Sequence, residues 1–545
     1  MKRAIIIGLC LQSYFYLVAQ NPFTAGEDSL AVENIRIEGL VIPDKPELKV
    51  PVPKVQFTRP DLTYTEIQVQ VPITLPPTSI RIAPPLNQPL PDYASRYIKL
   101  GGGRFGTTIG DLSWYNGKNN NLAWGADFHH RGMANGFAPY TEYLEHWGNA
   151  MLNYYKNKHI ISGRLYLHQA DYHHYGDVLL RTQPERETFS RRNFFRLMAE
   201  AGLSRNDPSK RGDYGVNFRY RMLSDNRQNQ ENHFTVDLKG STELSENLML
   251  KGIGDFTITG MQNGVSNLNR SFLHARPFLE YQKDEFTAIA GMGFNAYNDT
   301  VQQARVYPHI EAHYNILRER LRIGSIFTGG MQYQTLFDGI QENRYVDTVV
   351  SILPRTDKWN LQVYLSGKWN RILSWKFSVY SRGSDNQQIY FSQVQRLGYF
   401  DIRYDTGFVQ NGLRGDIMLN PSPKWDAGAS FTFNQNQTSR VEYFYHQPSW
   451  MAEGFVTWIP VPQLRLTLRN YTMGRRTMGL DPTLAPYASV EAPIFSDLAI
   501  SMDYRFYKRF SVFLEANNLA NQTLQRWYLY PERPLDFRAG LTAIF

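Results

Sequence analysis

The chain has 545 residues, 20% of them charged, and a formal net charge of +8 at pH 7. The positive charges form no basic block, so the composition gives no case for nucleic-acid binding. A single cysteine, Cys10, excludes a disulfide-stapled extracellular scaffold. Aromatic residues make up 14% of the chain although its mean hydropathy is −0.43. This combination is typical of a transmembrane β-barrel, in which alternate side chains face lipid and water.

The N-terminal residues have the three-part layout of a signal peptide. Lys2 and Arg3 precede an apolar stretch from Ala4 to Ala19, which is on the short side for a membrane-spanning helix. We therefore expect residues 1–20 to direct export in a Gram-negative cell and to be cleaved near Ala19, with a membrane anchor as the alternative. Beyond this stretch no apolar run is long enough for a transmembrane helix.

Residues 21–95 form a proline-rich segment, with twelve prolines from Pro43 to Pro91. Proline fixes φ and removes a backbone donor, so we expect an extended segment in the periplasm or in the lumen of a barrel. A disordered spacer is the alternative. The apolar residues that alternate between the prolines, as in VQVPITL, favour contact with a protein surface.

From residue 96 to 545 the pattern changes to strands of roughly ten alternating residues, the length of a tilted transmembrane strand. In DKWNLQVYLSGKW, Leu361, Val363 and Leu365 share one face, while Gln362 and Ser366 lie on the other. Similar strands recur in KWDAGASFTFN and SDLAISMDYRF. Tryptophans at strand ends predict the aromatic girdles of a barrel: Trp359, Trp369, Trp375 and Trp425.

The connections alternate between short turns and long loops, which predicts short periplasmic turns and longer extracellular loops. NGKNN, NPSPK, VPQ and YKR are short, whereas the stretches 131–146, 174–191, 333–357 and 473–493 are long. We expect an all-β fold, an antiparallel transmembrane barrel of about 22 strands (range 16–22). A soluble β-sandwich is the alternative, but it would not need so many strands with aromatic ends.

The chain ends in DFRAGLTAIF, a strand with a terminal phenylalanine. One face of this strand carries the residues that we expect the outer-membrane assembly machinery to read as an insertion signal: Phe537, Ala539, Leu541, Ala543 and Phe545. The segment from SDLAISMDYRF through LEANNLANQ to DFRAGLTAIF resembles the final three strands of TonB-dependent receptors. The resemblance implies the barrel domain of that family over about the last 125 residues, and over the region back to about Tyr97 by continuity of pattern.

The chain departs from the family before its barrel. TonB-dependent receptors carry a plug domain of over a hundred residues, and the 75 or so proline-rich residues before Tyr97 have no plug-like glycine-rich signature. The resemblance therefore implies a barrel that lacks the plug. A barrel of this size would be a wide pore, so we expect the proline-rich segment, inward-folded loops, lumenal side chains or a separate partner to fill it.

Three sets of residues could carry chemistry, and the pattern favours a structural role for each. The histidines could form a surface metal site, but no carboxylate or cysteine completes a ligand spacing: His129, His130, His168, His173 and His174. Asp171 with His173, or Asp177 with His174, lacks any sign of a nucleophile geometry. GGGRFG at 101–106 has no following helix, so its glycines are expected to ease packing in the first strand. We expect no catalytic, metal or cofactor site.

Two functions remain open. The first is passage or binding of solutes through a plugless receptor-like barrel in the outer membrane. The second is a non-transporting barrel that serves as a subunit or platform of an assembly or export complex, with residues 21–95 as a periplasmic strap. The expected partners are outer-membrane lipid, the assembly machinery, and a surface lipoprotein or a periplasmic protein. A lumen packed by its own loops would favour the platform, and an open polar path would favour transport.

Overall fold

The computed structural model describes residues 96–116, 121–176, 191–205, 212–263, 266–299, 302–317, 320–347, 352–393, 398–479 and 489–545. The predicted signal peptide (1–20) and proline-rich segment (21–95) lie outside these residues. No helix in the described part of the chain is long and apolar enough to cross a membrane.

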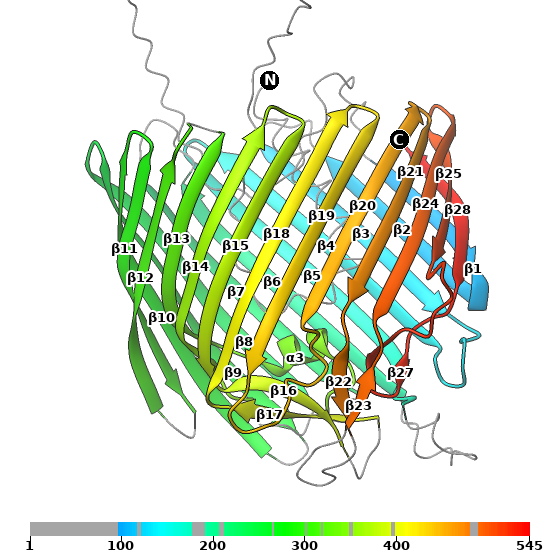
Figure 1. Ribbon diagram of the computed structural model, residues 1–545, viewed down its shortest axis with the longest axis horizontal. Helices are drawn as coiled ribbons and strands as arrows, with labels where there is room; N and C mark the ends of the chain where they lie inside the picture. Colours follow the sequence, from blue (N-terminus) through cyan, green and yellow to red (C-terminus); the bar gives the residue numbers. More distant parts are fainter. Residues whose placement is uncertain are drawn as a thin grey trace, which may run out of the picture.

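The described residues form a closed barrel of 22 antiparallel strands, which confirms the predicted fold (Figure 1). The strands of the wall are β1 (Arg96–Gly103), β2 (Thr107–Asn116), β3 (Leu122–Met133), β4 (Tyr143–Lys156), β5 (His159–His173), β6 (Arg191–Arg205), β7 (Asp213–Asp225), β8 (Gln230–Ser245), β9 (Leu248–Asn263), β10 (Ser266–Lys283), β11 (Phe286–Asn298), β12 (Gln302–Asn315), β13 (Leu321–Gln332), β14 (Arg355–Trp369), β15 (Leu373–Asp385), β18 (Phe408–Ser422), β19 (Trp425–Gln437), β20 (Trp450–Val461), β21 (Leu464–Met473), β24 (Phe495–Tyr507), β25 (Phe510–Asn517) and β28 (Asp536–Ile544). The 3-10 turn η1 (Arg104–Gly106) joins β1 to β2.

The alternation of side chains is as the sequence predicts. On β14, Leu361 and Val363 are more than 40% exposed on the outer surface of the barrel, whereas Gln362 and Tyr364 are buried on the inner side. A barrel wall pairs the backbone groups of each strand with those of its neighbours, so this apolar surface can lie in hydrocarbon. The barrel is therefore a membrane-spanning one, of the kind found in outer membranes.

The barrel closes between its first and last strands, which pair from Tyr97 opposite Ile544 to Gly103 opposite Arg538. The ring of Phe513 on β25 covers this junction from the inside. A Cβ on Gly101 would lie 2.6 Å from that ring, and one on Gly540 would meet it at the same distance. The glycines of the GGGRFG stretch therefore let an aromatic ring pack against the closing strands, as the sequence analysis expected.

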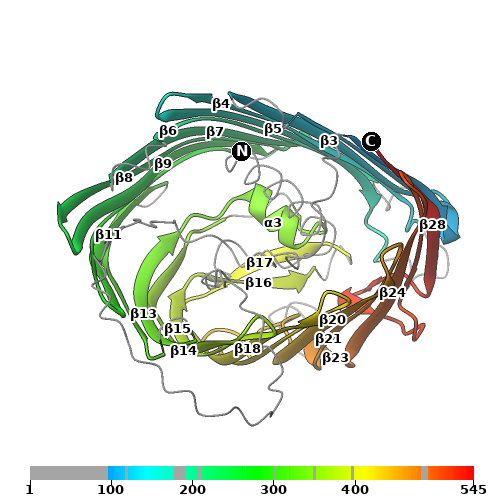
Figure 2. The same cartoon turned by 90° about the horizontal axis from the view of Figure 1, so that it is seen from above.

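The two ends of the barrel differ. The short turns and the C-terminus lie at one end, and the long connections lie at the other (Figure 1). We call the second the outer end, because the longer loops of such barrels are extracellular. Short elements in these connections follow β13, β15, β21 and β25: α3 (Leu336–Glu342), β16 (Gln387–Ser392), β17 (Phe400–Asp405), β22 (Arg476–Gly479), β23 (Ser489–Ala492), β26 (Gln525–Trp527) and β27 (Tyr530–Pro531). Along the barrel axis, α3 and the β16–β17 hairpin lie inside the ring of strands (Figure 2).

Candidate functional site

Three connections fold inward at the outer end and form what we call the outer lid, the described residues of 333–354, 386–407 and 518–535. Only the first is among the long loops predicted from the sequence. All three share one hydrophobic core with the inner face of strands β5, β6, β7 and β9. The lid contributes Leu336, Phe337, Ile340, Val346, Ile352, Tyr390, Phe400, Ile402, Trp527 and Tyr530, and the wall contributes Ala170, Tyr172, Phe194, Leu223 and Met261.

A buried ion pair on the wall fixes the first lid segment. The Glu231 carboxylate on β8 accepts the backbone N–H groups of Leu336 at 3.1 Å and Phe337 at 2.8 Å, at the start of α3. Arg270 on β10 lies 3.3 Å from the same carboxylate and donates to the Ile352 carbonyl at 2.9 Å. Both charged side chains are fully buried. Because neither charge can reach water, each depends on the other and on the lid backbone.

A second buried arginine holds the middle of the same segment. Arg192 on β6 donates to the Val346 carbonyl at 2.6 Å and lies 3.2 Å from Asp225 on β7. The Tyr172 hydroxyl on β5 donates to the carbonyl of Arg344. These contacts bond the first lid segment to four wall strands, β5, β6, β8 and β10.

The three lid segments also bond to one another. The Phe400 backbone N–H donates to the Tyr345 carbonyl at 3.1 Å, and the Asp347 N–H donates to the Phe400 carbonyl at 2.8 Å. The Tyr530 hydroxyl donates to the Gly398 carbonyl, and its ring stacks on Tyr345 with centroids 3.5 Å apart. These contacts make the lid one packed unit.

Two lid carboxyls have shifted pKa values of opposite sign. Enclosure within the barrel raises the pKa of Glu342 above its usual value, partly offset by the Tyr390 hydroxyl, which donates to it at 2.8 Å, and by Arg526. Burial would also raise the pKa of Asp405, but donors from Arg440, Gly407 and Ser439 outweigh it and hold the pKa below its usual range. Protonation of these two carboxyls therefore acts on the lid in opposite directions.

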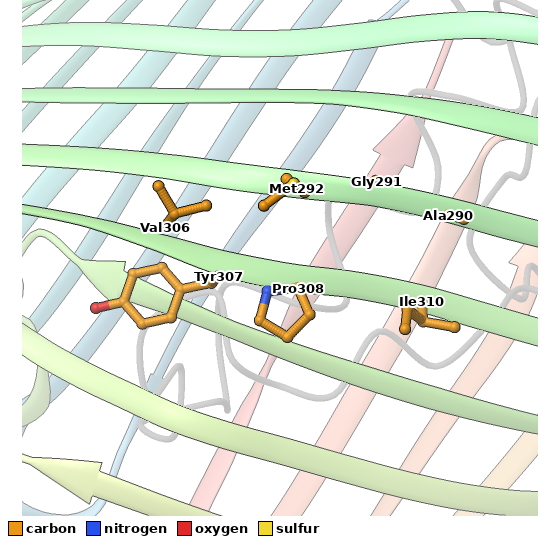
Figure 3. Close-up of a pocket in the computed structure, with 7 residues that line it drawn as sticks. All are labelled: Ala290, Gly291, Met292, Val306, Tyr307, Pro308 and Ile310. Carbon is orange, nitrogen blue, oxygen red and sulfur yellow. The ribbon is translucent and has the colours of Figure 1, made fainter.

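Two hollows in the described part of the chain lie outside the lumen. One is on the lipid-facing side of β11 and β12, where a space of 620 Å³ is lined by apolar residues (Figure 3): Ala290, Gly291, Met292, Val306, Tyr307, Pro308 and Ile310. The other lies within the loop 134–142 between β3 and β4. Neither collects charged groups around a space in the lumen, as a solute-binding site would require.

The histidines considered as metal ligands in the sequence analysis contact different partners. His129 bonds Asp111 at 2.7 Å, and His168 bonds Glu145 at 2.7 Å. His174 stacks on Tyr399 of the lid at 4.2 Å. Within the described ranges, no group of three or more histidine, cysteine, aspartate or glutamate side chains could hold a metal ion. Asp171 forms an ion pair with Arg191.

The predicted girdle residues lie toward the ends of wall strands, and the predicted insertion residues alternate along β28 and the residue after it. Trp369 and Trp425 are exposed near the end with the short turns, and Trp425 stacks on Trp458 with centroids 5.5 Å apart. The ring of Trp375 covers Gly367, and Trp359, at the outer end of β14, covers Gly383. On β28, Phe537, Leu541 and Phe545 are exposed, with Ala539 and Ala543 between them. Their roles as girdle and insertion signal stay predictions.

Comparison with solved structures places the fold. The FrpB iron transporter from Neisseria meningitidis has a TM-score of 0.66 and 10% identity, covering 83% of this chain and 81% of that one. The ferric-catecholate import receptor Fiu from E. coli K12 has a TM-score of 0.64 and 9% identity, covering 84% and 82%. The pyoverdine outer membrane receptor FpvA from Pseudomonas aeruginosa PAO1 has a TM-score of 0.63 and 10% identity, covering 83% and 78%.

The barrel therefore has the fold of TonB-dependent receptor barrels. This confirms, for the fold, the resemblance noted in the last strands. No protein-family model and no curated protein matches the sequence. In the described residues, the lumen at the outer end holds the chain's own loops and no separate plug domain.

Proposed function

We propose that this protein is a non-transporting barrel of the outer membrane, which serves as a subunit or platform of a membrane complex. The outer lid supports this proposal. Three loops and four wall strands share one apolar core, and buried charges such as Arg270 and Glu231 join the lid to the wall. Opening such a lid would separate buried ionic partners, which is strongly unfavourable unless each charge gains a new partner.

Passage or binding of solutes is the second candidate. It is favoured by the similar structures, which are named as an iron transporter, a ferric-catecholate import receptor and a pyoverdine receptor. In this candidate the outer lid would have to open in each cycle. All three relatives are named as transporters or receptors, and we propose that this chain likewise is not an enzyme.

The rest of the proposal concerns the ends of the chain. Residues 1–20 would direct export and residues 21–95 would be a periplasmic strap, while the C-terminal strand would be read by the assembly machinery. Beyond lipid and that machinery, the partner would be a surface lipoprotein or a periplasmic protein.

Single-channel conductance of the full-length protein in a planar bilayer separates the two functions. A platform predicts no current, with or without ferric siderophores, and large openings after Glu231→Ala loosens the lid. Silence in the native protein together with openings in the variant shows that the lid is the barrier. Reversible openings of the native protein on addition of a solute would contradict the platform and support passage.

A further inference from the structure

Among the described residues, neighbouring wall strands part at the junction between β12 and β13. β12 pairs with β11 along its whole length, from Gln302 opposite Asn298 to Tyr314 opposite Phe286. Its pairing with β13 covers only the part from His309 to Asn315. In the part of the chain that the structure describes, residues 302–308 have no backbone partner on the β13 side. We call these seven residues the open edge.

An irregularity in β13 causes the two strands to separate. Its register shifts between Thr328 and Gly330, after which the strand continues its pairing with β14 alone. The Met331 N–H donates to the side-chain oxygen of Asn295 on β11 at 3.1 Å, and Met331 packs against Tyr297. The outer end of β13 therefore lies against inward-facing side chains of β11, out of line with β12.

A glycine allows this arrangement. A Cβ on Gly329 would lie 2.7 Å from the ring of Tyr307 on β12. The ring occupies the place where a side chain of β13 would stand, so β13 passes on the inner side of β12. The open edge of β12 therefore stays in the barrel wall, while the outer end of β13, which would otherwise pair with it, is displaced toward the lumen.

The Pro308 end of the open edge borders the lipid-facing apolar surface. Met292 is 60% exposed and Val306 54% exposed on the outer surface, and both line the apolar hollow (Figure 3). Alternate residues of a strand point their N–H and C=O groups to the same side, so about three residues of the edge present unpaired groups. Such groups cost several kcal/mol each in hydrocarbon, and membrane barrels avoid open edges for this reason.

We propose that the open edge binds an extended segment of a partner protein, which adds to β12 as a further antiparallel strand. A lipid chain could fill the apolar hollow but could not hydrogen-bond to the backbone. Strand addition satisfies both the backbone groups and the hollow. Pro308 has no N–H, so it ends the docking edge at the point where pairing with β13 begins.

Charge selects the kind of partner. Arg305 is exposed at the centre of the open edge. A symmetric antiparallel pairing of two copies centred on this edge would place the two copies of Arg305 opposite each other, and directly opposed like charges are destabilising. A segment with an acidic residue opposite Arg305 and apolar residues facing lipid fits better. This inference rests on the proposed platform function, because it names the partner that a platform would hold.

Site-specific photo-crosslinking in the native outer membrane tests the proposal. The full-length protein carries p-benzoylphenylalanine at Ala304 or at Val306, and crosslinked residues are located by mass spectrometry. The control position is Val379 on β15, which is 66% exposed to lipid but paired with strands on both sides. Positions 304 and 306 should link to one other protein at sites two residues apart in reversed order, and Val379 to lipid alone.

Lipid adducts alone at 304 and 306, or links to a second copy of this chain, would overturn the proposal. Charge gives an independent check. Arg305→Glu should lower the crosslink yield at Val306 at least several-fold, while Arg305→Lys should retain it. Equal yields in both variants would count against an acidic partner strand.

Conductance keeps this test separate from that of the proposed function. If the barrel gives no current and the paired crosslinks are absent, the proposed partner strand is contradicted but the proposed platform function is not. If solutes open the barrel and the paired crosslinks are present, the platform function is contradicted but the binding of a strand to the open edge is supported.

Discussion

The wall and the outer lid of this barrel are built on different principles. In the wall, each strand alternates between lipid-facing and lumen-facing residues, and stability comes from a repeated ladder between neighbours. In the lid, segments separated by more than a hundred residues meet in one apolar core and through individual buried polar contacts, such as those of Glu231 and Tyr530. A repeated ladder tolerates the loss of one member, whereas the loss of one buried charge in the lid leaves its partner charge without compensation. The two regions should therefore respond differently to single substitutions.

The largest effect is expected from Glu231→Ala. This change leaves Arg270 buried without its carboxylate and removes the acceptor at the start of α3, which costs about 3–5 kcal/mol. Hydrogen exchange at residues 336–342 should accelerate by on the order of 10² to 10³-fold. The control is Glu280→Ala, which breaks the partly exposed pair with Lys251 on the wall and should cost less than about 1 kcal/mol. Equal acceleration in both variants would contradict the role of the Glu231–Arg270 pair in holding the lid.

The same contrast explains what the sequence could predict. Period-two alternation reports the environment of each residue, so the strands and their faces could be inferred from patterns such as DKWNLQVYLSGKW. The lid has no period. Nothing local in Phe400 or Tyr530 indicates that they pack together, and the segments 386–407 and 518–535 are not among the predicted long loops.

The buried charges were hidden for a related reason. Glu231, Arg192 and Arg270 stand between other polar residues, in the stretches QEN, RRN and NRS, so the local sequence does not mark them as buried. Their burial depends on which loop covers them. The register shift at Gly330 is likewise invisible, because a one-residue irregularity in a glycine pair fits many pairings.

A substitution at the junction where β1 meets β28 should destabilise the barrel wall. Gly101→Val would put its side chain against the Phe513 ring and the Ala539 carbonyl, and overpacking of this kind costs about 1–3 kcal/mol. Gly252→Val is the matched control, since a Cβ on Gly252 meets nothing within 4 Å. The urea midpoint of unfolding, followed by the heat-modifiable mobility of the barrel, should fall for the first variant only. A fall of equal size in both would show that the contact with Phe513 is not what requires a glycine at position 101.

A smaller effect should appear in the pH dependence of the lid. The pKa of Glu342 is raised in the folded lid, so this group favours the lid most at pH values below the ordinary glutamate pKa. That contribution is lost as the pH rises through the raised pKa. Glu342→Gln should flatten the exchange rate of residues 336–342 between about pH 5 and pH 8, after correction for intrinsic exchange. Conservation of the native pH profile in the variant would remove Glu342 as its source.

The smallest effect on stability is expected at the C-terminus. The backbone of Phe545 bonds to Arg96 in both directions, whereas its exposed ring meets Phe510 at 6.0 Å. Phe545→Ala keeps the backbone bonds, so the free energy of unfolding should change by less than about 1 kcal/mol. Phe506→Ala is a close control, because its exposed ring also stacks on Phe510, at 6.5 Å. If the assembly machinery reads the last residue, the amount of folded barrel in the outer membrane should fall several-fold for Phe545→Ala and not for Phe506→Ala. Equal amounts of both variants would mean that the ring is not part of an insertion signal.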